Sequence, residues 1–231
     1  MDTKDESQNK AAPEPDMKDF TLGKPALVCR WRLYDQKLPL ENRHMRALGA
    51  RRIQGAPLRG TLLEWAKQHI EWTLEEGSAA HPFGVLMIIV DEEGRAAMTV
   101  GPYEPLQETA ARELAIRALR SRREFEETAI APETFWAVRP DGTLILGAGP
   151  EERVAGATSL IQDLAQTLGM PVVRMPDLAS AYLEGSVDAA EYFLVSDEHG
   201  VVPAADATGK TSESFRAGYQ KLLDKTRRKK A

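Results

Sequence analysis

The sequence predicts an α+β fold, and three observations support that prediction. Apolar residues alternate on either side of turn signals such as Asp141-Gly142, which is typical of β-hairpins. Apolar residues also recur every three to four positions in two long stretches, 61–76 and 160–168, which indicates amphipathic helices. Strand pairs and helices follow one another along the whole chain, so we expect helices packed on sheets.

Glycine, proline and capping residues mark where these elements begin and end. Thr61 and Glu64 have the spacing of a capping box, and Gly77 is placed to end the helix that follows. Pro102 and Pro105 separate the first half from the next helix. The predicted helices are 41–52, 61–76, 107–123, 160–168, 177–184 and 212–225, and the predicted strands are 26–34, 83–90, 96–100, 135–138, 144–146, 192–195 and 201–203.

Composition shifts divide the chain into four parts. The polar residues 1–19, which include two prolines, predict a disordered lead-in. We expect an N-terminal α+β domain at 20–104 and a C-terminal domain at 105–225. Residues 226–231 form a basic tail, which is expected to be a solubilising terminus rather than a contact for RNA or lipid.

Composition also narrows the class of protein. A formal charge of −5 argues against a general nucleic-acid binder. No apolar run approaches the roughly 18 residues of a membrane helix, so the expectation is a cytoplasmic protein without membrane contact. The single cysteine, Cys29, excludes an intramolecular disulfide and lies in an apolar run, which favours a buried, inert thiol.

The candidate ligand contact is the step Gly156, Ala157 and Thr158 at the start of a predicted helix. Free backbone N–H groups and a hydroxyl at a helix start suit a phosphate group. The alternative is that Thr158 only caps its helix. His199 lies beside two acidic residues, but neighbours on a short loop rarely converge on one ion, so no metal site is predicted.

Four motifs in sequence order resemble the class IV pyridoxal-phosphate enzymes, which include branched-chain aminotransferases, D-amino-acid transaminases and aminodeoxychorismate lyases. They are Glu133–Val138 with the Asp141-Gly142 turn, Val154–Thr158, Glu191–Leu194 and Val201–Ala204. The resemblance implies two domains, namely a shortened N-terminal α/β sandwich layer and a C-terminal open-barrel-like α/β domain. It also implies pyridoxal phosphate as cofactor, with its phosphate at Gly156, Ala157 and Thr158, and a homodimer.

Two phosphate contacts of that family are altered here. His44-Met45-Arg46-Ala47-Leu48 resembles the family's H-L-x-R-L pattern but has Ala47 in place of the arginine. Asp197 stands where the family has a threonine, and a carboxylate repels a phosphate unless a cation lies between them. The family's glutamate for the pyridine nitrogen falls near Glu127 or Thr128, and the asparagine of its turn is Glu133.

The family's lysine is also missing from its expected place. The chain has no lysine between Lys67 and Lys210, and the segment where the family carries it has arginines only. Schiff-base chemistry needs a primary amine that can lose its proton near neutral pH, which arginine cannot supply. No catalytic residue is therefore assigned.

The sequence supports three hypotheses. The first is a divergent, non-catalytic class IV protein, a pseudoenzyme that serves as a scaffold or binds a small phosphate-bearing molecule. The second is an active pyridoxal-phosphate aminotransferase or lyase acting on amino acids, branched-chain aminotransferase-like, with a lysine from an unexpected position or from a partner subunit. The third is an unrelated binding module with the same α+β order. The missing lysine favours the first.

Overall fold

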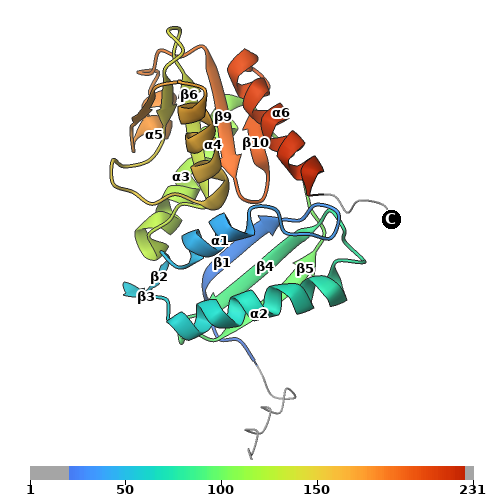
Figure 1. Cartoon of the computed structure of the whole chain (residues 1–231). Coiled ribbons are helices and arrows are strands. Elements are labelled where there is room, and N and C mark those ends of the chain that lie inside the picture. Colours follow the sequence, from blue (N-terminus) through green and yellow to red (C-terminus); the bar gives the residue numbers. More distant parts are fainter. Residues whose placement is uncertain (1–20, 227–231) are drawn as a thin grey trace, which may run out of the picture.

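The computed structural model describes residues 21–226 as two main β-sheets with helices packed against each, together with a small two-stranded sheet formed by 52–53 and 56–57 (Figure 1). The predicted lead-in lies outside the described residues, and so does the basic tail apart from Thr226. The α+β prediction is confirmed. The boundary at 104/105 stays a prediction, and the two sheets lie on either side of it in sequence.

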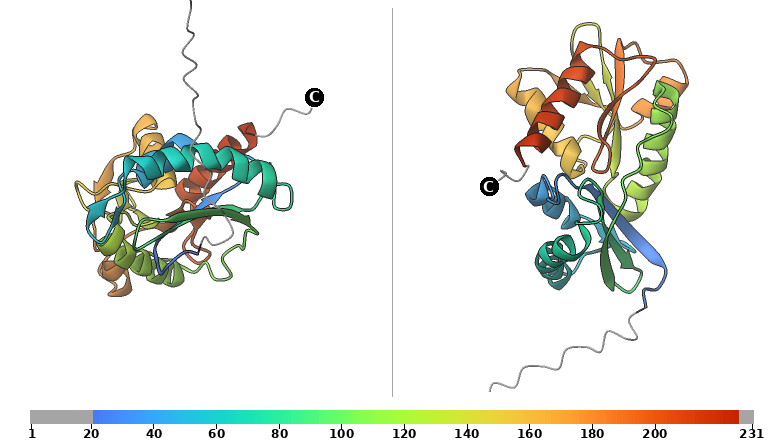
Figure 2. Two further views of the ribbon diagram at one scale, coloured as in Figure 1. Left: turned by 90° about the horizontal axis from the view of Figure 1, so that it is seen from below. Right: turned by 90° about the vertical axis from the view of Figure 1, so that its right-hand side faces the viewer.

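The N-terminal sheet is antiparallel, with the strand order β1-β4-β5. Two helices, α1 and α2, cover one of its faces (Figure 2). Alternation along β1 buries Leu27, Cys29 and Trp31 under these helices and turns Val28 and Arg30 to the opposite face. The elements of this half are β1 (Pro25–Arg32), α1 (Glu41–Leu48), β2 (Arg52–Ile53), β3 (Ala56–Pro57), α2 (Gly60–Gly77), β4 (Val85–Asp91) and β5 (Ala96–Gly101).

The C-terminal sheet has five strands in the order β10-β9-β6-β7-β8, and only the β7–β8 pair is parallel. Helices α4 and α6 pack on one face of this sheet, and α3 and α5 pack on the other. Strands β6 and β9 are therefore buried along their whole length. The elements are α3 (Ala111–Thr128), β6 (Glu133–Val138), β7 (Leu144–Leu146), α4 (Gly156–Thr167), β8 (Val172–Arg174), α5 (Leu178–Leu183), β9 (Glu191–Ser196), β10 (Gly200–Pro203) and α6 (Lys210–Lys225).

Polar contacts join the two halves. The backbone N–H of Arg32, at the end of β1, donates to the carbonyl oxygen of Asp197 at 3.1 Å. The buried side chain of Arg51 donates to the carbonyl oxygen of Ile130 at 2.6 Å and to the Thr128 hydroxyl at 2.9 Å. Helix α1 lies directly against α4 (Figure 1).

Several predicted boundaries were wrong, and side-chain contacts explain two of them. Helix α1 ends at Leu48 rather than at residue 52, because Arg51 turns inward to the contacts described above. Helix α3 starts at Ala111 rather than at residue 107. The Asp206 carboxylate fixes this start, because it accepts the Ala111 N–H at 2.7 Å. That carboxylate comes from 95 residues away, so no local pattern marks this helix start.

Two predicted caps are not formed. The capping box of Thr61 and Glu64 is absent, because α2 has Arg59 at its N-cap without a side-chain hydrogen bond. The idea that Thr158 caps α4 is also wrong, because Ala155 holds the N-cap position. Strand β8 was not predicted from the sequence.

Candidate functional site

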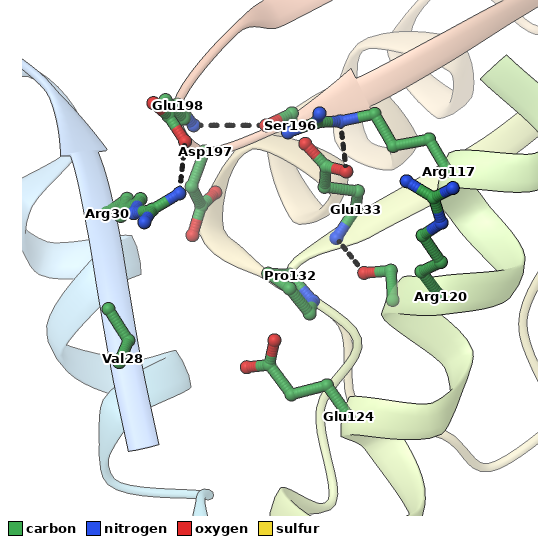
Figure 3. Close-up of a pocket in the computed structure, with 11 residues that line it drawn as sticks. Val28, Arg30, Arg117, Arg120, Glu124, Pro132, Glu133, Ser196, Asp197 and Glu198 are labelled. Atoms are coloured by element: carbon green, nitrogen blue, oxygen red, sulfur yellow. Dashed lines mark hydrogen bonds and ion pairs between the residues drawn. The ribbon is translucent and has the colours of Figure 1, made fainter. Parts of the chain in front are cut away.

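A cavity of about 360 Å³ lies between the two halves (Figure 3). One wall is the β1 face that the helices leave uncovered, and the other walls come from α3, the start of β6 and the end of β9. Its lining residues are Val28, Arg30, Arg117, Arg120, Ser121, Glu124, Pro132, Glu133, Ser196, Asp197 and Glu198.

Most carboxylates in this cavity already have a cationic partner. Arg117 Nε lies 2.6 Å from Glu133 Oε2. Glu124 Oε1 accepts a hydrogen bond from Arg51 Nη1 at 3.0 Å. Burial raises the pKa of the Glu124 and Glu133 carboxyls above the ordinary glutamate value, although their arginine partners oppose the shift.

The cationic groups are less completely paired. Within residues 21–226, Arg120 makes no hydrogen bond or ion pair, although its side chain lines the cavity. Arg30 has only a distant partner, since its Nη1 lies 3.7 Å from Glu198 Oε2. The cavity therefore presents two guanidinium groups, from opposite walls, that are not engaged by a close carboxylate.

His199 lies behind Arg117, on the loop after β9. Its Nε2 lies 3.0 Å from Arg117 Nη2, and its Nδ1 lies 3.3 Å from the Tyr103 hydroxyl. Burial, together with Arg117 and the neighbouring arginines 32 and 30, lowers the pKa of His199 to about 4. The ring is therefore neutral near pH 7 and accepts a hydrogen bond from Arg117.

Asp197 occupies the N-terminus of α4. Its Oδ1 accepts the Ala157 N–H at 2.6 Å, and its Oδ2 lies 3.4 Å from the Gly156 nitrogen in a longer hydrogen bond. The residue is 5% exposed. Burial by itself would raise the pKa of this carboxyl, but His44, the Ala157 N–H and Arg51 together hold it below the usual aspartate value.

His44, on α1, completes this cluster from the other half of the molecule. Its Nδ1 lies 3.3 Å from Asp197 Oδ2, and the ring is stacked on Trp31 with a centroid distance of 5.0 Å. A Cβ atom at Gly156 would lie 2.7 Å from His44 Nδ1. Glycine is required at position 156 because the imidazole lies directly on the helix start.

Thr158, the third residue of the predicted phosphate contact, does not join Gly156 and Ala157 at Asp197. Thr158 is fully buried, and its hydroxyl lies 2.8 Å from the Thr134 hydroxyl, which also accepts a hydrogen bond from Trp136 Nε1. This chain of polar side chains joins α4 to β6, inside the C-terminal half. The structure brings Gly156 and Ala157 together with Asp197, and it points the Thr158 hydroxyl away from them.

Sequence reasoning missed two features of this site. It did not foresee the contact between His44 and Asp197, although it placed Asp197 at a phosphate contact of the resembled family and His44 in the pattern that carries that family's phosphate-binding arginine. It also did not identify the cavity arginines as a group. The sequence signal was the basic helix end at 117–123, which usually only complements the helix dipole and has anion binding as the alternative.

Pyridoxal phosphate does not fit the residues as they stand. The two N–H groups at the start of α4 are occupied by a buried carboxylate, and the His44 ring fills the space beside Gly156. No lysine lines the cavity in the described part of the chain; Lys67 and Lys210 are exposed on α2 and α6. We therefore derive no reaction step through this cofactor.

Between residues 21 and 226, no cluster of three or more His, Cys, Asp or Glu side chains is placed to hold a metal ion. Over the same residues, no helix combines the length and the apolar character needed to cross a membrane.

Comparison with known proteins identifies the fold. Neither a protein-family model nor a curated protein matches the sequence. Among solved structures, the 4-amino-4-deoxychorismate lyase from Pseudomonas aeruginosa matches with a TM-score of 0.55 and 16% identity, over 93% of this chain and 97% of that chain. A hypothetical aminotransferase from Mycobacterium tuberculosis in its PLP-bound form matches with a TM-score of 0.57 and 14% identity, over 92% and 94% of the two chains. At these identities the likeness concerns architecture, and it shows that this chain has a class IV aminotransferase-like fold.

Proposed function

We propose that this protein is a divergent member of the class IV aminotransferase-like fold, a pseudoenzyme that binds a small carboxylate-bearing molecule without pyridoxal-phosphate chemistry. The observation that carries the proposal is the make-up of the cavity between the halves. Among residues 21–226, its Arg120 guanidinium has no partner, its Arg30 guanidinium has only the 3.7 Å contact with Glu198, and no lysine lines it.

The pairing of charges favours an anionic ligand. Glu124 and Glu133 are held by Arg51 and Arg117, so they have little capacity left for a ligand cation. Arg120 has no partner among the described residues. A guanidinium group binds a carboxylate through two parallel N–H donors, which gives both affinity and orientation.

The cavity size is compatible with such a ligand. A volume of about 360 Å³ lies within the range typical of small-molecule sites. The residues come from both halves, so a bound molecule would contact β1 and α3 together.

The alternative function is an active pyridoxal-phosphate aminotransferase or lyase acting on amino acids. The PLP-bound neighbour with the same fold is the observation in its favour. It requires a lysine from an unexpected position or from a partner subunit. The homodimer implied by the resemblance belongs to the same proposal, and sedimentation equilibrium of the full chain tests it.

One experiment separates the two functions. The purified protein is titrated with pyridoxal phosphate, followed by visible absorbance, borohydride trapping and peptide mapping. We expect no stoichiometric adduct. A single lysine labelled by borohydride would refute the proposal and make the protein an enzyme with a relocated amine.

A second experiment tests the ligand class. Isothermal titration with succinate and citrate, chosen as small carboxylate probes, is compared for the parent protein and Arg120→Ala. Loss of a hydrogen-bonded charge pair predicts an affinity at least roughly tenfold lower for the variant. Arg123→Ala is the matched control, because Arg123 is exposed on the same helix and does not line the cavity. Equal loss in both variants, or no binding of either probe to the parent, would contradict a carboxylate site at Arg120.

A further inference from the structure

The N-terminus of α4 has the donors of an anion-binding site. Two successive backbone N–H groups, those of Gly156 and Ala157, converge on one position, and the positive end of the helix dipole lies behind them. In a twelve-residue helix these donors have no partner within the helix itself.

A second observation, independent of the helix end, points to the same position. His44 Nδ1 is buried, with the residue 2% exposed, and it makes no hydrogen bond within the described structure. It lies 3.3 Å from Asp197 Oδ2 and is therefore directed at the place where the helix donors converge. The close approach of His44 to Gly156 fixes the ring there.

The anion at this position belongs to the protein itself. Asp197 is brought to the helix start by β9, and its own carbonyl oxygen accepts the Arg32 N–H from the other half. A covalently tethered carboxylate acts at a high effective concentration, so a free anion in solution competes poorly with it. A phosphate that entered beside it would also meet an uncompensated like charge.

We propose that Asp197 is a built-in anion that fills a phosphate-type site at the start of α4 and closes it to external ligands. It joins β9, α4 and α1 through one carboxylate and thereby fixes the two halves against each other. Removing the carboxylate should open the site and make it bind inorganic phosphate. The inference concerns Asp197 and is independent of whether the neighbouring cavity binds a carboxylate.

The test uses the full chain carrying Asp197→Ala, with inorganic phosphate as the probe. Thermal unfolding is followed at increasing phosphate, with chloride added to keep the ionic strength constant. We expect the Tm of the variant to rise with phosphate and that of the parent to stay level. Phosphate affinity, measured by calorimetry, should be at least roughly tenfold higher in the variant, because several donors to a charged group become free.

Two further variants control the experiment. Asp163→Ala removes an aspartate from the exposed side of the same helix, and its response to phosphate should equal that of the parent. Asp197→Ala combined with His44→Ala should lose most of the gained affinity, because the third contact is removed.

Two results would overturn the inference. One is a folded Asp197→Ala variant that responds to phosphate no more than the parent does. The other is a parent protein whose Gly156 and Ala157 amide NMR signals shift on addition of phosphate as they do in the variant.

Recovery of the folded state of Asp197→Ala by added phosphate would also support the inference. If this variant stays unfolded at every concentration, Asp197→Asn decides, since it keeps the shape and removes the charge. Stability equal to the parent's would overturn the need for an anion, and reduced stability would support it.

Discussion

Asp197 belongs to two charged regions, the start of α4 and the wall of the cavity, which differ in how completely their charges are paired. At the start of α4, backbone donors and His44 surround one buried carboxylate. In the cavity, by contrast, Arg120 faces open space without a partner within the described chain. Buried charges need internal partners, whereas partly exposed ones can keep water or a ligand. The first region therefore serves the fold, and the second has capacity for binding.

The largest effect is expected at the closed region. Asp197→Ala should lower the free energy of unfolding by about 3–5 kcal/mol, the usual cost of removing one partner from a buried charged cluster. Guanidinium denaturation measures it. The exposed pair of Asp163 with Arg43 is the control, and Asp163→Ala should cost less than about 1 kcal/mol. Similar losses in the two variants would show that Asp197 contributes no more than a surface charge.

A glycine comparison tests the close approach of His44. Gly156→Ala should cost about 1–3 kcal/mol, because the new methyl group would lie 3.2 Å from the His44 backbone nitrogen as well as 2.7 Å from the ring. Gly218→Ala, in the middle of α6 with no atom within 4 Å, should instead stabilise by about 0.5–1 kcal/mol. Thermal unfolding of both variants provides the measurement, and a neutral Gly156→Ala would mean that the helix start has room to spare.

The two regions should also respond to acid in different pH ranges. The pKa of His199 is about 4 in the fold and near 6.5 when unfolded. The unfolded chain therefore takes up this proton first, so stability is full above about pH 6.5 and falls as the pH drops toward 4. His199→Gln should flatten that decline.

Asp197 should act at lower pH. Its pKa is lowered in the fold, so its contribution is present above the usual aspartate range near pH 4 and is lost as the pH falls further. Asp197→Asn should remove this acid-side step. Urea denaturation between pH 3 and pH 8 tests both variants. Each unit of difference between the folded and unfolded pKa changes the free energy of unfolding by roughly 1.4 kcal/mol. If Asp197→Asn changed the slope only above pH 5, the assignment of the acid step to Asp197 would be wrong.

The smallest effect on stability is expected in the open cavity. Arg120→Ala should change the free energy of unfolding by less than about 0.5 kcal/mol, because Arg120 makes no hydrogen bond or ion pair with the residues that the structure describes. The same variant is expected to weaken carboxylate binding, as proposed above. A loss of more than 1–2 kcal/mol would show that Arg120 has a structural role and would shift the binding proposal to Arg30.

The sequence predictions were accurate where an element depends on neighbouring residues, and they failed where it depends on residues distant in the sequence. Regular apolar spacing identified α2 and β6, and continuous apolar runs identified β4 and β9, because both kinds of pattern can be seen within a few neighbouring residues. The start of α3 was missed, since its cap is Asp206 from a distant part of the chain. Thr158 was predicted to contact a phosphate or to cap its helix, and only the packed sheet shows its hydroxyl against Thr134.

The sequence by itself determined the α+β class, the buried thiol of Cys29 and the stretch without lysine between Lys67 and Lys210. These depend on composition and on local spacing. The tertiary structure decided that the Asp197 carboxylate lies at the start of a helix 40 residues earlier, with His44 from the other half beside it. Such a cluster forms only when two sheets and two helices dock, and the contacts of docked elements leave no periodic pattern in any one of them.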